Sequence, residues 1–279
     1  MTQPLLICTD MDRTLLPNGD APESPRCREH FATVARQSDV RVAYVTGRDR
    51  TLVEAAIEHW SLTRPDFVIG DVGTTLYEVS DTGWRISPDW RSMISSDWAE
   101  LGHDALVDLL DGIEGPRAQE AEKQGEFKLS YYVPLEADRE SVLEAMWARL
   151  AGRGLKANLV WSVDEPAGVG LLDVLPASAG KLHAIEFLIR MNGFARERCL
   201  FAGDSGNDLQ VLTSPVKSVL VANASPGVRE EAQALATAAG NADTLYIARG
   251  GVRDLNGNYA AGILEGLAHF FPWTVEWWR

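Results

Sequence analysis

The 279-residue sequence has few cysteines and no long hydrophobic run. Its three cysteines, Cys8, Cys27 and Cys199, show no Cys-x-x-Cys or cysteine–histidine spacing, which argues against a disulfide framework and against a zinc site. No segment approaches the roughly 18 apolar residues that a membrane span requires. The N-terminal residues include no basic leader. We therefore expect a soluble, cytoplasmic protein without a membrane partner.

Basic residues are also scarce. The sequence has 26 lysines and arginines against 40 aspartates and glutamates, so its formal net charge is −14 at pH 7. A surface of this charge repels the phosphates of nucleic acids, which excludes nucleic acid as a partner of the chain as a whole. An anionic small molecule could bind only where a metal or a local group of cations offsets the acidic surface.

What is present is the composition of a globular protein, with 46% hydrophobic and 24% charged residues. Short apolar segments rich in β-branched residues alternate with helical patterns, which predicts an α/β fold with a doubly wound parallel sheet. We predict strands at residues 5–9, 42–45, 67–69, 199–202, 219–222 and 245–248. We predict helices at residues 25–37, 49–60, 181–191, 208–213, 227–236 and 259–271. Ligands of such sheets bind at the carboxyl ends of the strands.

The segment from about residue 83 to residue 164 departs from this alternation. It begins with spaced tryptophans, continues with EFKLSYYV, which alternates like a half-exposed strand, and then has the helical pattern ESVLEAMWARL. This order predicts an inserted α+β domain. We therefore expect a discontinuous core of residues 1–82 and 165–279 and an inserted domain of residues 83–164.

Two carboxylates, Asp10 and Asp12, follow the first predicted strand directly. Residues two positions apart in an extended chain share a side, so both carboxylates should converge above the edge of the sheet. Like charges at that distance repel, and a hard cation such as Mg²⁺ would neutralise them. A turn or a helix cap is the alternative explanation of this short motif.

A second acidic loop, GDSGND, follows the predicted strand at 199–202. Its Asp204 and Asp208 could complete an oxygen-rich metal site together with the first pair, and its glycines allow a tight turn. A loop of glycine, aspartate and asparagine is also common in ordinary turns. Two acidic loops after two buried strands are harder to explain by turn formation alone.

Two further features suit an anionic ligand. Thr46-Gly47-Arg48 follows a predicted strand and offers a hydroxyl and backbone N–H groups at a helix start, which are donors for phosphate oxygens. Lys181 opens a predicted helix, where its charge opposes the helix dipole and calls for a compensating partner. A helix cap with a surface arginine, and a solvated surface lysine, are the alternatives.

Taken in order, DMDRT, TGR, Lys181 and GDSGND resemble the four motifs of the haloacid dehalogenase (HAD) phosphatase superfamily. The resemblance implies that Asp10 is a nucleophile that forms an aspartyl-phosphate. It implies that Asp12 protonates the leaving oxygen and then deprotonates the attacking water. Thr46 and Lys181 would hold the phosphoryl group, and Lys181 would also balance the charge of Asp10.

The same resemblance implies a Mg²⁺ cofactor. Asp10, the backbone carbonyl of Asp12, and Asp204 would ligate the ion, and Asp208 and Asn207 would support the site. We accordingly assign Asp10, Asp12, Asp204 and Asp208 to the metal. Thr46, Gly47, Arg48 and Asn207 are expected to contact the substrate.

The place of the insertion resembles the type 2 α/β cap of this superfamily. The stretches 71–77, 119–132, 172–176 and 261–267 and the spaced tryptophans resemble the sucrose-phosphate phosphatase branch. The expected function is Mg²⁺-dependent hydrolysis of a disaccharide phosphate such as sucrose 6-phosphate. Mannosylfructose phosphate or another glycosyl phosphate, a broad range of hexose phosphates, and a catalytically inactive regulatory domain are the alternatives. The expected assembly is a monomer or a small homo-oligomer.

Three polar residues of the insertion, Gln119, Glu122 and Lys128, are candidates for binding sugar hydroxyls, since the resemblance places this segment over the core's active site. Lys128 alternates with Phe127 and Leu129, so it should point away from the insertion's own core. A solvated sheet face is the alternative for Gln119 and Glu122. We expect most tryptophans of the insertion to fill its core.

Two features fall outside the resemblance. Arg13 stands where a small or neutral residue is more usual, and it could contact substrate or merely offset local acidity. The tail FFPWTVEWWR adds three tryptophans that have no assigned role.

Overall fold

A computed structural model describes residues 4–99, 101–164 and 167–278, and its larger sheet has eight strands in the order β12-β11-β10-β1-β2-β3-β4-β5. The strands from β12 to β3 pair in parallel, and β4 pairs antiparallel with both β3 and the edge strand β5. The strand bounds are β1 Leu5–Thr9, β2 Val40–Val45, β3 Phe67–Gly70, β4 Thr75–Ser80, β5 Gly83–Ile86, β10 Cys199–Gly203, β11 Lys217–Leu220 and β12 Leu245–Ile247. The prediction of a doubly wound parallel sheet is confirmed.

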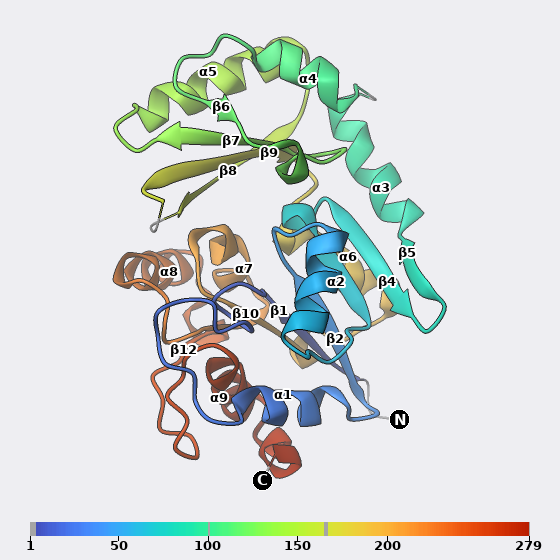
Figure 1. The fold of residues 1–279 in the computed structure, drawn as a ribbon, viewed down its shortest axis with the longest axis vertical. Helices are drawn as coiled ribbons and strands as arrows, with labels where there is room; N and C mark the ends of the chain where they lie inside the picture. The colour runs from blue at the N-terminus through green and yellow to red at the C-terminus, as the bar shows by residue number, and fades with distance from the viewer. Residues whose placement is uncertain (1–3, 100, 165–166, 279) are drawn as a thin grey trace.

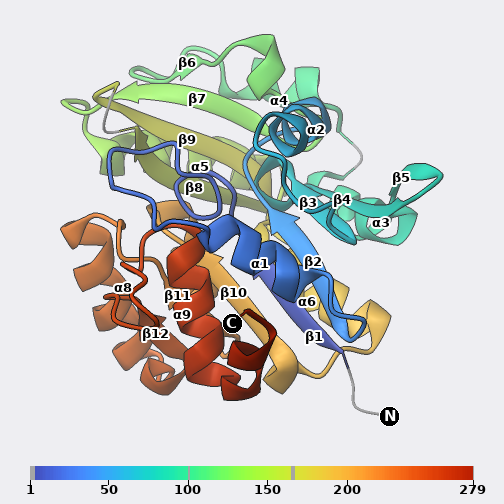
Figure 2. The ribbon, with the colours of Figure 1, turned by 60° about the horizontal axis from the view of Figure 1, so that its bottom comes forward.

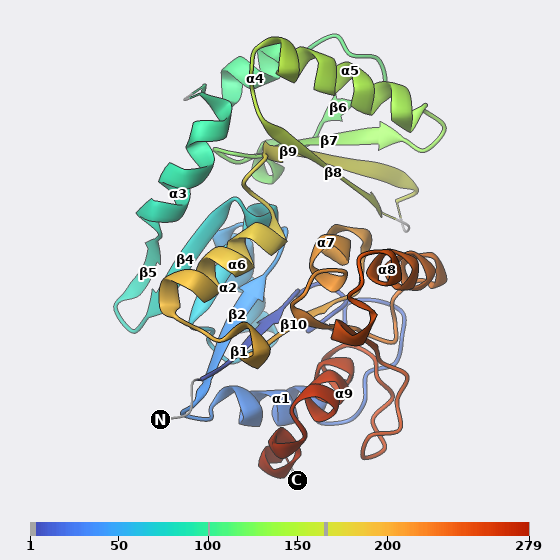
Figure 3. The same cartoon turned by 180° about the vertical axis from the view of Figure 1, so that it is seen from behind.

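Helices cover both faces of this sheet (Figures 1 and 3). Both faces are apolar, as strand β1 shows. Leu5 and Ile7 pack into the apolar cluster on one face, and Leu6 and Cys8 pack into the cluster on the other. The first face is covered by α1 Cys27–Ala35, α2 Arg50–His59 and α9 Ala260–Phe270. The second is covered by α6 Lys181–Asn192, α7 Leu209–Leu212 and α8 Pro226–Ala238. No helix within the described ranges is long and apolar enough to cross a bilayer.

A second, four-stranded antiparallel sheet has the order β6-β7-β9-β8. Its strands are β6 Arg117–Ala118, β7 Leu129–Pro134, β8 Ala157–Asp164 and β9 Val169–Pro176. Helices α4 His103–Leu110 and α5 Arg139–Gly152 lie on its outer side, and α3 Pro88–Ser95 leads up to it from the larger sheet (Figure 1). Its other side faces the larger sheet, and we call this small sheet with α3, α4 and α5 the cap.

The boundaries drawn from the sequence at residues 83 and 164 do not follow the two sheets. β5 pairs with β4 in the larger sheet, where Trp84 packs edge-on against Tyr77 at 5.4 Å between ring centroids. β9 lies between β7 and β8 in the smaller sheet and pairs antiparallel with both. Residue 165, where the core was expected to resume, lies outside the described residues. We infer that the cap runs from α3 to β9.

Three of the nine tryptophans are buried, whereas Trp147 of the insertion and Trp273 of the tail are 43% and 44% exposed. Trp90 and Trp98 are 1% and 0% exposed and pack against Phe187 and Phe127, as expected for an insertion that needs large apolar side chains. The C-terminal tail forms a 3₁₀ helix, Pro272–Trp278, that lies against α1 and α9 (Figure 2). Trp278 is 3% exposed there, so part of the tail belongs to the core.

Candidate active site

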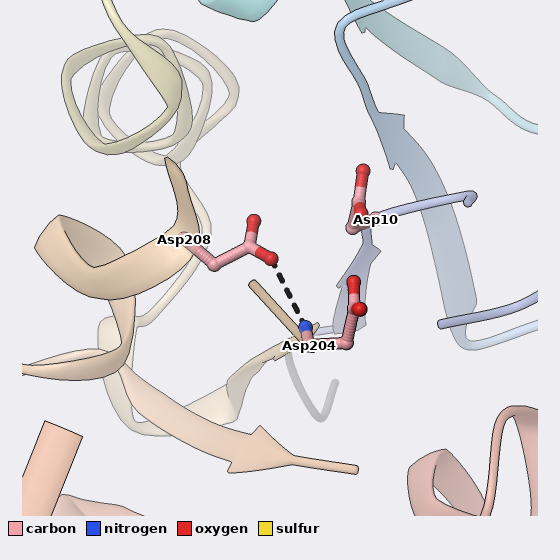
Figure 4. A group of neighbouring side chains, drawn as sticks. All are labelled: Asp10, Asp204 and Asp208. Atoms are coloured by element: carbon pink, nitrogen blue, oxygen red, sulfur yellow. Dashed lines mark hydrogen bonds between the residues drawn. The ribbon is translucent and has the colours of Figure 1, made fainter. Parts of the chain in front are cut away.

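Three carboxylates meet at the carboxyl edge of the larger sheet. Asp10 follows β1 and Asp204 follows the adjacent β10, so parallel pairing places them side by side. Asp208 comes from the 3₁₀ turn after β10, and one oxygen of each carboxylate lies within 4.8 Å of the others (Figure 4). Gly203 permits this approach, because a Cβ there would lie 2.6 Å from the Asp208 carboxyl carbon.

Lys181 lies among these carboxylates and is only 3% exposed. Its Nζ is 3.1 Å from Oδ1 of Asp10, and it donates to Oδ1 of Asp208 at 2.7 Å and to Oδ1 of Asn207 at 3.0 Å. Burial alone would lower the pKa of Lys181, but the charges of Asp10 and Asp208 raise it overall. The lysine is therefore charged, and the acidic neighbours compensate for its place at a helix N-terminus.

One lysine does not neutralise this cluster. Burial raises the pKa of Asp10 well above its usual value, and Asp208 and Asp204 raise it further, although Lys181 offsets part of the effect. Burial and the neighbouring Asp208 raise the pKa of Asp204 to about 7. Buried carboxylates crowded in this way fit a hard divalent cation, which favours oxygen ligands. The residues present therefore suit Mg²⁺.

Asp208 has a different task from the other two carboxylates. Its Oδ2 accepts hydrogen bonds from the backbone N–H groups of Asp204 at 3.0 Å and of Ser205 at 3.2 Å. These bonds fold the loop and hold Asp204 in place. Thr14 completes the arrangement, since its hydroxyl donates to Oδ1 of Asp204 at 3.2 Å.

Asp12 lies outside the carboxylate cluster. Its two oxygens accept hydrogen bonds from Nε and Nη2 of Arg48 at 2.8 and 2.6 Å, and Oδ1 also accepts one from Asn18. Burial would raise the pKa of Asp12, but the hydrogen bonds and charge of Arg48 lower it below its usual value. The Asp12 side chain thus points to Arg48. The Arg48 guanidinium, which was expected to contact substrate, is paired with Asp12 in this structure.

The loop after β2 lies beside the same edge. Thr46 is fully buried, and its hydroxyl accepts a hydrogen bond from the Arg48 backbone N–H at 3.2 Å. Gly47 and Arg48 line a cavity of about 530 Å³ between the core loops and the cap. Asp10, Asp12 and Asp204 form part of the core wall of this cavity. A second cavity, of about 440 Å³, shares Arg13, Val72, Asp204, Ser205 and Asn207 with it.

Lys128 crosses from the cap to the core. Phe127 and Leu129 are buried in the apolar cluster, and Lys128 points the other way, which confirms the alternation predicted from sequence. Its Nζ is 3.2 Å from Oδ1 of Asp71 and 3.4 Å from the carbonyl oxygen of Gly47. The side chain is 4% exposed, so it joins the two sheets as a buried ion pair.

Gln119 and Glu122, the other two cap candidates, line the same cavity. Gln119 donates from Nε2 to the backbone carbonyl of Tyr131 at 3.0 Å, and Glu122 is exposed. The three cap candidates therefore line the same cavity as the core loops. Thr46 and Lys181 are not among the residues that line it.

Sequence reasoning missed two acidic residues. Asp71 follows β3, so its place after a buried strand was the available signal. Burial raises its pKa, and Lys128 offsets part of this. Asp173 on β9 alternates with the buried Leu172 and Val174 and therefore faces the cavity. Burial raises its pKa too, and Ser130 Oγ donates to it at 2.5 Å.

Residues 3–271 match the family model of sucrose-6F-phosphate phosphohydrolase. The chain belongs to this family. Membership in the sucrose-6F-phosphate phosphohydrolase family confirms the predicted HAD superfamily and the predicted enzyme class, a phosphoric monoester hydrolase.

Proteins similar to this chain include a HAD-like hydrolase and two sugar-phosphate phosphatases. A protein of Nitrosococcus oceani described as a HAD-like hydrolase is 48% identical over 277 residues, which cover 99% of this chain and 74% of that protein. Sucrose-phosphatase 1 of Nicotiana tabacum is 27% identical over 95% of this chain, which spans 59% of the tobacco enzyme. Mannosylfructose-phosphate phosphatase of Agrobacterium fabrum is 28% identical over 79% of this chain and 84% of its own length.

Solved structures show the same fold. The sucrose-phosphatase of Synechocystis sp. PCC6803, determined with sucrose and phosphate, superposes with a TM-score of 0.75 at 24% identity, covering 96% of this chain and 98% of its own. A HAD subclass IIB sugar phosphatase gives a TM-score of 0.59 at 15% identity, covering 96% and 99%. At these identities the likeness concerns the fold, a Rossmann-like HAD core with a cap.

Proposed function

We propose that this protein hydrolyses a sugar phosphate, first of all a disaccharide phosphate such as sucrose 6-phosphate, through an aspartyl-phosphate at Asp10. The observation that carries the proposal is the buried cluster of Asp10, Asp204, Asp208 and Lys181, which borders a cavity walled on its far side by polar residues of the cap. A nucleophile, a cation site and a polar pocket of about 530 Å³ are therefore adjacent.

In the first step, a carboxylate oxygen of Asp10 attacks the phosphorus atom, and the bond between phosphorus and the sugar oxygen breaks. Asp12 gives a proton to that oxygen; because pairing with Arg48 keeps Asp12 ionised, it must first turn away from Arg48 and take up a proton from water. Lys181 and the hydroxyl of Thr46 hold the phosphoryl oxygens. The sugar leaves, and the phosphoryl group stays on Asp10.

In the second step, water attacks the phosphorus and gives its proton to Asp12, and the bond between Asp10 and phosphorus breaks to release inorganic phosphate. The arrangement of Asp12 suits this step. Its pairing with Arg48 lowers its pKa and so keeps it ionised, which is the form that accepts a proton.

Asp10, Asp204 and the backbone carbonyl of Asp12 would hold Mg²⁺, with Asp208 and Asn207 in support. When bound, the ion would supply positive charge that lets a phosphate approach these carboxylates. Among the groups of the chain, Lys181, whose Nζ is 3.1 Å from Oδ1 of Asp10, would contribute the same kind of shielding.

The cap would select the sugar. Gln119, Glu122 and Lys128 line the cavity, and polar groups around a concave site are suited to hydroxyl recognition. The relatives named above support a disaccharide phosphate, and the Agrobacterium enzyme makes mannosylfructose phosphate the second candidate. Hexose phosphates in general are the third. An inactive regulatory role has less support, because Asp10, Asp12 and Lys181 are all present.

A substrate panel tests the proposal. Purified protein with Mg²⁺ is given sucrose 6-phosphate, mannosylfructose phosphate, other glycosyl phosphates and hexose phosphates, and the release of phosphate is measured. We expect one disaccharide phosphate to lead clearly in kcat/KM. A shallow spread over hexose phosphates would favour broad specificity, and no turnover of any disaccharide phosphate would overturn the leading assignment.

A further inference from the structure

Arg13 has a backbone that is fixed from two sides. Its φ of 57° lies in the left-handed region, which residues with a side chain rarely adopt. Its N–H donates to Oδ1 of Asn18 at 2.7 Å, and its carbonyl accepts from Nδ2 of Asn223 at 2.6 Å. Two segments far apart in the sequence therefore hold Arg13 so that its side chain lines both cavities.

Arg13 also differs from the other cations beside the site. Among the described residues, four cations form ion pairs with carboxylates at the carboxyl edge of the larger sheet: Arg13, Arg48, Lys128 and Lys181. Both lysines are buried, and Arg48 donates from Nε, Nη1 and Nη2 to groups of the protein.

The guanidinium of Arg13 keeps its donors available. Its Nε is 3.5 Å from Oδ2 of Asp204, beyond a good hydrogen bond, and its side chain is 37% exposed. In the part of the chain that the structure describes, no side-chain hydrogen bond is donated by Arg13. Of the four cations, it is the one whose position and free N–H groups suit an incoming anion.

We infer that Arg13 binds the phosphate group of substrate and product, and that the same charge weakens the binding of Mg²⁺ beside Asp204. This inference rests on the proposed function of the site. The shared cause is electrostatic, because a guanidinium next to a metal ligand attracts an oxyanion and repels a cation. Arg13 thereby lowers the affinity of the site for Mg²⁺ and raises its affinity for phosphate.

The two effects of opposite sign make a direct test. Titration calorimetry measures the binding of Mg²⁺ alone, and then of inorganic phosphate in saturating Mg²⁺, to wild type and Arg13→Gln. We expect the Kd of Mg²⁺ to fall about threefold and the Kd of phosphate to rise about tenfold, as for the loss of one charge-assisted contact. Arg13→Lys should lie between wild type and Arg13→Gln in both titrations.

The matched control is Arg41→Gln. Arg41 pairs with Asp66 at 3.5 Å with 42% exposure, much as Arg13 pairs with Asp204, but it lies at the start of β2 and away from both cavities. Arg41→Gln should leave the Kd of Mg²⁺ and the Kd of phosphate unchanged. Weaker binding of both ligands by Arg13→Gln would mean that Arg13 only positions Asp204, and unchanged binding of both would make it a surface arginine. Either result overturns the inference.

The titrations are independent of turnover. If the substrate panel finds no active sugar phosphate, the proposed function fails, and the opposed shifts for Mg²⁺ and phosphate still decide the role of Arg13. If the panel succeeds and the shifts are absent, the inference about Arg13 fails alone. Wild-type protein that binds no phosphate would also overturn it.

Discussion

On the core wall of the larger cavity, the carboxylates Asp10 and Asp204 are buried, whereas on the cap wall Glu122 and Lys123 are open to solvent. Asp10 and Asp204 are at most 5% exposed, and the buried Lys181 forms an ion pair with Asp10. On the cap wall, Glu122 and Lys123 are exposed. In the function proposed here, the core wall would supply the preorganised reacting centre, and the cap wall would supply groups free to meet the sugar.

The largest effect is expected from Asp10→Asn. An amide cannot attack phosphorus as the carboxylate does, so kcat should fall at least about a thousandfold. Burial and neighbouring carboxylates raise the pKa of Asp10, so the neutral amide relieves repulsion and Tm should not decrease. Phosphate release and thermal unfolding measure the two outcomes. Activity close to wild type would remove Asp10 as the nucleophile.

Lys181→Met tests whether the core wall depends on internal charge balance. Removing one partner from a buried ion pair leaves uncompensated charge, which costs about 3 kcal/mol of folding free energy. We expect kcat to fall by about a hundredfold or more and the urea midpoint to decrease, with Mg²⁺ restoring part of the stability.

Lys156→Met, at an exposed lysine, is the control for Lys181→Met and should change neither activity nor the urea midpoint. Unchanged stability of the Lys181 variant would contradict the view that this wall is held together by its charges.

Substitutions on the cap wall should have smaller and more selective effects. In Gln119→Ala and Glu122→Ala, KM for the preferred sugar phosphate should rise about three- to tenfold, while kcat and Tm stay close to wild type. A small aryl phosphate without a sugar should be hydrolysed as before. Glu120→Ala is the matched control, since Glu120 bonds Tyr132 and is not among the residues that line the cavity. Equal losses of kcat/KM on the sugar phosphate and the aryl phosphate would contradict a separate sugar-binding role of the cap wall.

Much of the core wall could be predicted from the sequence. Parallel strands with fully apolar segments place the residues that follow them at one edge, so the meeting of Asp10, Asp204 and Lys181 required only strand order and motif resemblance. The partner of each charge could not be predicted. Arg48 was expected to meet the substrate, but side-chain geometry brings it to Asp12.

The boundary of the cap was harder to predict, because β9 directly precedes the core helix α6 in sequence but pairs with strands of the cap. The motifs around β9 suggest that it belongs to the core, but it forms a hairpin with β8 and pairs on its other side with the more distant β7. Asp173 was missed for the same reason. The alternation of Asp173 with buried leucine and valine neighbours was visible in the sequence. That its face of the strand borders the cavity follows only from the packing of the smaller sheet against the larger one.

The ion pair between Lys128 and Asp71 has a consequence for any separation of the cap from the core. When buried charges separate and return to water, their recovered hydration offsets most of the lost attraction, so such a pair adds little net strength to a closed state. A misplaced cap would instead leave one desolvated charge alone, which is costly. The pair therefore sets the position of the cap on the core without slowing the separation of the two. This property suits an enzyme that must admit substrate and release product at every cycle.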